Sequence, residues 1–349
     1  MNKPLRGLGA WAASLLAVAA SVLAAAALAQ APAPARQQPT SATRADLKTL
    51  DYRLQARNLG PGVWVVEGDN DDFSLANGCN IINTGFIATG GGVLVINTGP
   101  SRRYGEQLRA LIAKTSPEPV IGVLHLNLHP DYFLGNQAFA DVPRYATATT
   151  RSGMASEAAA YETNLYRLCG EWMKGTETLL PDKTLQVPAD GLWKLGNRSF
   201  RVTELNGHTP SDLVLQDLQT QISFAGGLVF AQRVPTTPHA DVPAWQASLR
   251  AMAVTAGAAT VPSHGPVHSD GSGLAQTAQY LRWLDQAFKQ HAQLGLDMNE
   301  VLRAPVPAEF KRWAAFETEF VRNVAHLYPR YERAALQPLP ASPLRQSQR

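Results

Sequence analysis

Three histidines stand where an apolar run of the chain gives way to a loop, each close to glycine or proline. They are His129, His208 and His264, and Asp131 follows the first of them by two residues. Neutral imidazoles and carboxylates that converge from separate elements suit zinc, and tight turns can hold such side chains in place. The conjunction of the three predicts a metal site. Any one of these histidines, taken alone, is better explained as a surface or hydrogen-bonded residue.

Apolar patterns predict the elements that must position these residues. Strands are expected at 63–66, 80–87, 93–96, 120–128, 200–205, 213–216, 221–229 and 260–261. Helices are expected at 103–114, 155–172, 245–254, 274–291 and 309–326. Because strands and helices interleave in both halves, the fold class is α/β rather than separate all-β and all-α domains.

The order of short motifs resembles the metallo-β-lactamase-fold hydrolases from about Val63 to Pro266. These motifs are Asn97–Gly99, Asn127–Asn136, Gly207–Pro210, Phe224–Gly227 and Ser263–Gly265. Asn80–Ile87, Asn127–Asn136 and the ending Val324–Tyr328 are similar, more closely, to the quinoprotein relay system zinc metallohydrolases of type 1. The resemblance implies an αββα metallo-β-lactamase-like sandwich with a metal at one edge between its sheets. It also implies a setting beside periplasmic dehydrogenases that use pyrroloquinoline quinone.

The chain departs from the family pattern at the metal site. The motif His-x-His-x-Asp-His has Asn127 and Tyr132 in place of its first and last histidines, Gly227 replaces the bridging carboxylate, and Asn97 replaces a strand-end aspartate. The family's ligands survive as His129 and His208 for one metal and as Asp131 and His264 for the other. Without the bridge, two neighbouring cations would repel each other with little anionic compensation. We therefore expect one zinc ion rather than two.

Two functions compete on this basis. The first is a single-zinc hydrolase of an unknown small molecule, in which Asp131 completes the metal shell or acts as base, Asn127 orients water and Tyr132 donates to an oxyanion. The second is a non-hydrolytic periplasmic accessory protein of a quinoprotein dehydrogenase. There, the metal is lost and aromatic residues such as Tyr132, Tyr166 and Trp172 stack on a flat ligand. A purely structural exported protein is a third alternative.

Simpler roles are expected for the other histidines. His125 is interpreted as a core-edge residue and His268 as a neighbour of the site. His239 lies in a proline-rich loop that would follow the Gly227 strand near the mouth of the site. His291 and His326 fall on helices and are expected to face solvent or to pack. Asp131 could instead bond loop amides, and His264 could stabilise a turn.

The chain ends have the pattern of an exported protein. Residues 1–29 combine Lys3 and Arg6 with an uncharged apolar run and a small-x-small cleavage pattern, which predicts a cleaved signal peptide rather than a membrane anchor. A Pro/Ala-rich linker (30–45), one domain (46–335) and a polar tail (336–349) complete the expected organisation. The protein is then periplasmic or secreted, with no membrane association after cleavage. There, a disulfide between Cys79 and Cys169 is permitted but not required.

Composition excludes several other classes. The 349 residues are 45% hydrophobic and only 17% charged. The apolar fraction is ordinary for a globular protein, and the composition is unlike that of a coiled coil or a disordered chain. A net charge of +3 without a dense Lys/Arg run gives no indication of nucleic-acid binding. The chain also lacks a Gly-x-Ser-x-Gly elbow, the signature of the common serine hydrolases.

Overall fold

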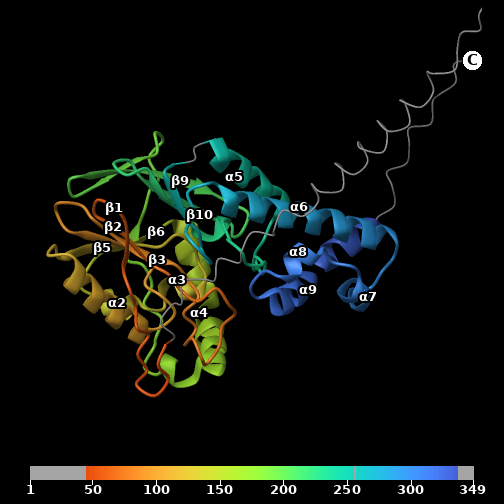
Figure 1. Ribbon diagram of the computed structural model, residues 1–349, viewed down its shortest axis with the longest axis horizontal. Helices are drawn as coiled ribbons and strands as arrows, with labels where there is room; N and C mark the ends of the chain where they lie inside the picture. The colour runs from red at the N-terminus through yellow and green to blue at the C-terminus, as the bar shows by residue number, and fades with distance from the viewer. Residues whose placement is uncertain (1–44, 255–256, 337–349) are drawn as a thin grey trace, which may run out of the picture. The chain divides into compact units, whose positions relative to one another are not determined.

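Twelve strands build the centre of the computed structural model, which describes residues 45–254 and 257–336. They are β1 (Arg57–Gly60), β2 (Val63–Val66), β3 (Thr84–Ala88), β4 (Val93–Ile96), β5 (Val120–Leu124), β6 (Arg144–Ala146), β7 (Lys183–Thr184), β8 (Leu192–Leu195), β9 (Arg198–Leu205), β10 (Asp212–Asp217), β11 (Ile222–Phe224) and β12 (Ala259–Val261). The first seven form one sheet in sequence order, and the others form a second sheet in the order β12-β11-β10-β9-β8. Figure 1 shows the two sheets together.

Helices surround the sheets. They are α2 (Arg102–Thr115), α3 (Pro130–Phe133), α4 (Ala148–Cys169), α5 (Val242–Val254), α6 (Ser272–Gln293), α7 (Met298–Arg303), α8 (Ala308–Lys311) and α9 (Phe316–Leu336). Short 3-10 helices are η1 (Asn136–Phe139), η2 (Gly170–Met173) and η3 (Gly226–Leu228). No helix among the described residues is long and apolar enough to cross a membrane.

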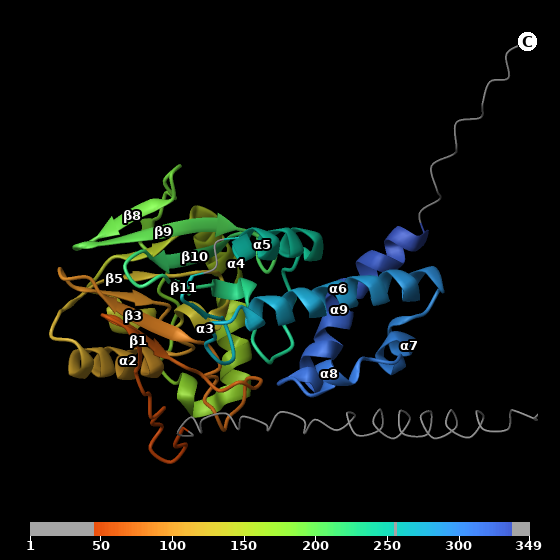
Figure 2. The same ribbon diagram turned by 45° about the horizontal axis from the view of Figure 1, so that its top comes forward.

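Strand β4 shows why the sheets form a sandwich. All four of its residues are buried. Because side chains alternate between the two faces of a strand, they pack in two different hydrophobic clusters. Val93 and Val95 pack in a cluster with residues of α2 and α4. Leu94 and Ile96 pack in a second cluster with residues of β9, β10 and β11. A third cluster lies between the second sheet and helices α5, α6 and α9. The layers are therefore helix, sheet, sheet, helix, which confirms the expected α/β sandwich (Figure 2).

Several expected strands are too long. The strand expected at 120–128 ends at Leu124, and beyond it the side chain of Asn97 accepts the backbone N–H of Leu126 at 3.1 Å. The strand expected at 221–229 ends at Phe224, because Gly226 adopts a φ of +53° and begins a 3-10 turn. Apolar content alone did not reveal where the ladder bonds stop. The loops that follow these shortened strands, after Leu124 and after Phe224, lie at the candidate site.

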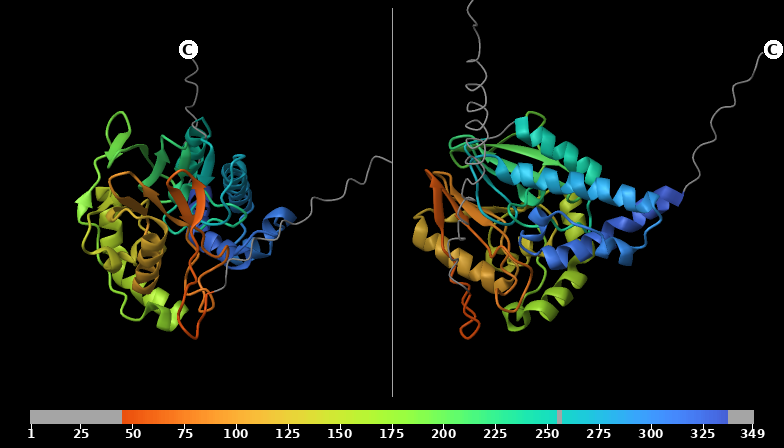
Figure 3. Two further views of the ribbon diagram at one scale, coloured as in Figure 1. Left: turned by 60° about the vertical axis from the view of Figure 1, so that its left-hand side comes forward. Right: turned by 45° about the vertical axis from the view of Figure 1, so that its right-hand side comes forward.

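The C-terminal helices form a group of their own. α6 and α9 pack against each other, and α7 and α8 pack against α9, as Figure 3 shows. The helix expected at 309–326 is interrupted near Ala315, which has a φ of +55°. α9 continues to Leu336. The expected signal peptide, the linker up to residue 44 and the tail from residue 337 lie outside the described residues.

A disulfide joins Cys79 and Cys169, a pairing that the sequence left open. Their Cα atoms are 5.9 Å apart, within the range that a disulfide spans. Both residues are buried. The bond ties the long β2–β3 connection to the end of α4.

Candidate functional site

The predicted site residues lie where strands of both sheets end. His129 immediately precedes α3 and Asp131 lies in its first turn, in the segment that follows β5. His208 lies in the turn between β9 and β10, and His264 follows β12. All four side chains are buried, with residue exposures between 0% and 8%.

Glycine and proline fix these loops locally. Gly207 has a φ of +132°, and a Cβ there would lie 2.2 Å from the Cα of Trp245 in α5. Only glycine therefore lets the β9–β10 turn pack this closely on the helix. Pro130 occupies the first position of α3, where its missing N–H costs no hydrogen bond. His208 and His129 are thus presented by stiff backbone.

The four residues come together as two pairs. The rings of His129 and His208 are 4.6 Å apart between centroids and nearly perpendicular. The Nε2 atom of His264 lies 3.7 Å from Oδ2 of Asp131. The ring of Phe230 lies between the pairs, with its centroid 5.5 Å from that of His208 and 5.0 Å from that of His264.

Neighbouring protein groups lie within hydrogen-bond distance of three of the four imidazole nitrogens of the first pair. Nε2 of His129 is 3.1 Å from Nδ1 of His239, so one of these nitrogens donates to the other. Nε2 of His208 is 3.3 Å from the Thr236 hydroxyl. Nδ1 of His208 is 3.4 Å from Oδ1 of Asp212. The sequence did not indicate Thr236 or Asp212, because nothing in their local pattern distinguishes them from ordinary loop and strand-end residues.

Asn127 and Tyr132, which replace family histidines, also form hydrogen bonds with neighbouring loop residues. The side-chain carbonyl of Asn127 accepts the backbone N–H of His129 at 2.9 Å, and its amide lies 3.4 Å from Nδ1 of His208. Tyr132 is completely buried. Its hydroxyl lies 2.6 Å from that of Ser263. Asn127 and Tyr132 therefore hold loops together where the family has ligands.

The ring of His208 fills the space beside Gly227. A Cβ on Gly227 would lie 1.9 Å from Nδ1 of His208 and 2.5 Å from the side-chain nitrogen of Asn127. Such contacts are far inside van der Waals distance. The packing here has closed over the position where the family carries its bridging carboxylate.

Burial keeps the histidines neutral. Desolvation lowers the pKa of His208 to about 3 and the pKa values of His129 and His264 well below the ordinary value. The positive charge of Arg233 lowers the pKa values of His208 and His264 further. This guanidinium is fully buried and lies 5.9 Å from the centroid of the Phe230 ring.

Burial has the opposite effect on the carboxyl groups. It raises the pKa values of Asp131 and Asp212 to about 7, because the charged form of an acid loses more hydration than the neutral form. Hydrogen bonds from Thr209 oppose this rise at Asp212. Oδ2 of Asp131 is buried and has no hydrogen-bond partner.

The donor set does not fit a metal ion. Among residues 45–254 and 257–336, no group of three or more His, Cys, Asp or Glu side chains is arranged to hold one. Zinc needs three or four donors directed at one point. Here, His129 and His208 each share a ring nitrogen with a loop residue. Oδ2 of Asp131 and Nε2 of His264, 3.7 Å apart, supply only two further donors.

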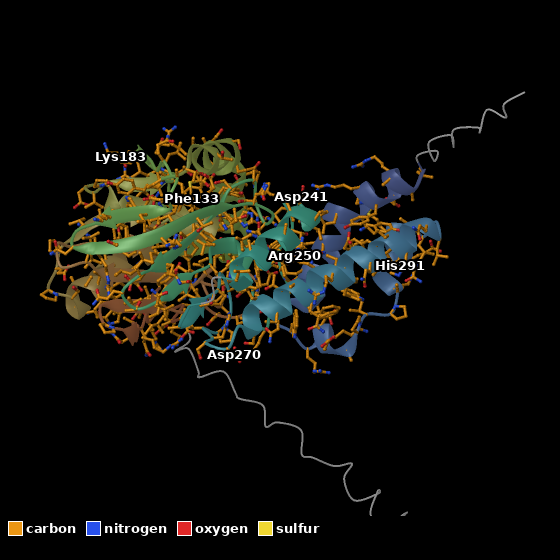
Figure 4. All side chains as sticks on the ribbon, turned by 90° about the horizontal axis from the view of Figure 1, so that it is seen from above. Phe133, Lys183, Asp241, Arg250, Asp270 and His291 are labelled. Atoms are coloured by element: carbon orange, nitrogen blue, oxygen red, sulfur yellow. A yellow bond between two sulfur atoms is a disulfide. The ribbon has the colours of Figure 1, made fainter. Side chains whose placement is uncertain are left out.

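The other candidates fall in different places. Tyr166 is 55% exposed. Trp172 is buried and packs on Tyr52, with 4.4 Å between the ring centroids. These positions do not support the expectation that Tyr166 and Trp172 stack on a ligand together with Tyr132. His125 is buried, with Nδ1 3.1 Å from the Tyr132 carbonyl. Figure 4 shows His291 on α6, well apart from Phe133 of α3.

An open groove adjoins the site. It has a volume of about 530 Å³. Leu128 and Pro210, the neighbours of site residues, line one side of it, and small residues of α4 line the other. These helix residues are Ala148, Thr149, Ser152, Gly153 and Ser156.

Comparison with known proteins identifies the family. The metallo-beta-lactamase superfamily model matches residues 77–264, and the chain belongs to this superfamily. A metallo-beta-lactamase from Pontibacter korlensis aligns with a TM-score of 0.53 and 23% identity, covering 66% of this chain and 99% of that one. A metallo beta lactamase from Hirschia baltica aligns with a TM-score of 0.52 and 18% identity, covering 65% and 97%. At these identities the likeness establishes the fold alone. No curated protein matches the chain.

Proposed function

We propose that this metallo-β-lactamase-fold protein is exported and binds a small molecule without a catalytic metal. The observation that carries the proposal is the pairing of the imidazole nitrogens, His129 with His239 and His208 with Thr236 and Asp212. A metal must displace such partners before it can bind. Loss of the family residues at Asn127 and Gly227 supports the same interpretation.

The groove beside the histidines is the proposed binding place. Leu128 and Pro210 offer apolar contacts, and Thr149, Ser152 and Ser156 offer hydroxyl groups. This mixed lining suits a small molecule with a flat apolar body and a few polar atoms, such as a quinone. The ligand would lie next to His129 and His208 without being hydrolysed.

The proposed setting is the periplasm. The signal-peptide pattern of residues 1–29 and the Cys79–Cys169 disulfide both favour an oxidising compartment. The resemblance to quinoprotein relay system proteins favours an accessory role in a pyrroloquinoline quinone-dependent dehydrogenase system. A dehydrogenase of that kind is the proposed protein partner.

A single-zinc hydrolase is the second candidate. Asp131 and His264 favour it, because Oδ2 of Asp131 lacks a partner and Nε2 of His264 lies only 3.7 Å away. In addition, Nδ1 of His264 is 2.7 Å from the Ile81 carbonyl, the kind of contact that orients metal-binding histidines. On this alternative, the site would act on a thioester, lactone, lactam or phosphoester.

Ligand binding and hydrolysis measured before and after chelation test the proposal. Mature protein purified from the periplasm is titrated with pyrroloquinoline quinone. It is also assayed for hydrolysis of a thioester, a lactone, a lactam and a phosphoester. We expect quinone binding that chelation leaves unchanged, and no turnover. A Ser152→Trp variant, which fills the groove, should lose binding. Turnover that disappears on chelation and returns with zinc would instead establish the second candidate.

A further inference from the structure

One loop supplies partners to both paired histidines. Residues 233–240, here named the strap, run between η3 and α5. Thr236 lies 3.3 Å from Nε2 of His208, and Nδ1 of His239 lies 3.1 Å from Nε2 of His129. The strap therefore meets the site at two points three residues apart.

The C-terminal helices hold the strap in place. The hydroxyl of Thr237 donates to the side-chain carbonyl of Asn323 at 2.7 Å, and both residues are fully buried. Arg330 donates to the backbone carbonyl of Ala240 at 2.8 Å. At the start of the strap, the backbone N–H of Val234 donates to the carbonyl of Ala314 at 3.1 Å. All these anchors lie beyond residue 264, where the superfamily match ends.

Asn323 is the central anchor. Its side-chain carbonyl oxygen accepts a hydrogen bond from the Thr237 hydroxyl. Its amide nitrogen donates one to the hydroxyl of Tyr280 in α6 at 2.9 Å. A buried amide that uses both ends in this way allows one arrangement of its neighbours, because any shift leaves a polar group unsatisfied. Thr237 lies between Thr236 and His239, so its position fixes both.

We propose that Asn323 is a positioning residue for the site. Through the strap, α9 sets the orientation and tautomer of His129 and His208, because the hydrogen bond at one ring nitrogen determines which nitrogen of a neutral imidazole carries the proton. The C-terminal helices thereby complete a site whose other residues belong to the superfamily domain. The inference holds whether or not the site takes a metal, so it does not rest on the proposed function.

The rate at which each histidine of the full mature protein is chemically modified, and its tautomer, test the inference. Carbethoxylation by diethylpyrocarbonate, followed residue by residue with mass spectrometry, reports exposure of ring nitrogens, and nitrogen-15 NMR reports tautomers. In an Asn323→Ala variant we expect His129 and His208 to react about fivefold faster, the effect of losing one net hydrogen bond. Their nitrogen signals should also shift. Asn323→Asp, whose two carboxylate oxygens can accept from the hydroxyls of Thr237 and Tyr280, should restore the wild-type behaviour.

Direct changes in the strap keep the test valid if Asn323→Ala fails to fold. His239→Ala should speed the reaction of His129 and leave His208 unchanged, and Thr236→Val should do the reverse. Buried His125, which has no contact with the strap, is the internal reference. Unchanged rates and signals in Asn323→Ala, or equal effects of both strap variants on both histidines, would overturn the inference. These measurements depend on neither zinc nor ligand binding. A failure of the inference can therefore be told apart from a failure of the proposed function.

Discussion

Gly227 marks the place where this chain differs most from a two-metal enzyme. His208 packs against it so closely that even a methyl group would overlap the imidazole. The position of His208 therefore requires a residue without a side chain at 227. Restoring the carboxylate alone should not restore a metal site.

A Gly227→Asp variant should be destabilised by about 3 kcal/mol, because overpacking displaces His208 and buries a new carboxyl group. Urea unfolding measures the loss. Gly122→Ala is a suitable control, since the nearest contact of its Cβ, with the Tyr145 ring at 3.3 Å, is much less severe and should cost much less. Equal stability of Gly227→Asp and wild type would show that His208 moves aside freely.

Buried titratable groups make stability depend on pH. Burial lowers the pKa of His125 and that of His208 to about 3, whereas the unfolded chain protonates histidine near pH 6.5. As pH falls below about 6.5, the unfolded state gains protons that the folded state does not, and the free energy of unfolding decreases. Asp131 and Asp212, with pKa values raised to about 7, act in the opposite direction between about pH 4 and 7.

The histidines should dominate, because His129 and His264 add to the same effect. We expect a lower free energy of unfolding at pH 5 than at pH 7. A His125→Asn variant, whose amide can still reach the Tyr132 carbonyl, should lose about 2 kcal/mol less over this range. Urea unfolding at both pH values measures the difference. Parallel pH dependences of the two proteins would contradict this account of His125.

At the scale of elements, the β2–β3 connection depends on cross-links. The Cys79–Cys169 disulfide closes a sequence separation of 90 residues, and Arg322 of α9 holds Asp72 through two hydrogen bonds of 2.8 and 2.9 Å. The connection has no helix or strand between β2 and β3. These two links therefore add to the turn and loop hydrogen bonds that hold the connection in place of helix or strand bonds.

Removing the disulfide should lower the free energy of unfolding by about 2–4 kcal/mol, because the unfolded chain regains the freedom of a long loop. A Cys79→Ala/Cys169→Ala double variant compared with wild type under oxidising conditions measures this. Adding a reductant should bring the wild type to the same value and leave the variant unchanged. A variant as stable as the oxidised protein would show that packing alone orders the connection.

The sequence was sufficient for elements with a clear local pattern. β4 has the predicted bounds, and α2 differs from its prediction by one residue at each end. Strand ends were harder, because the side chain of Asn97 and the backbone of Gly226 stop strands in ways that apolar content does not reveal. The sequence placed His239 near the mouth of the site, but its contact with His129, 110 residues away, depends on the tertiary fold.

At the scale of the whole molecule, the superfamily domain is combined with helices that follow it. α6, α8 and α9 share a hydrophobic cluster with α5 and with Val214 of β10, and α9 holds the strap. The strap in turn pairs the site histidines with protein groups. The site histidines of this metallo-β-lactamase fold are thus part of a packed network of protein groups.

The zinc content of the protein tests whether this network leaves room for a metal. Mature protein, isolated without chelators from cells supplied with zinc, is analysed by mass spectrometry of its elements, with a His129→Ala variant alongside. We predict less than about 0.1 zinc ion per chain in both proteins, because the donors do not converge on one point. About one zinc ion per wild-type chain, lost in His129→Ala, would contradict the account.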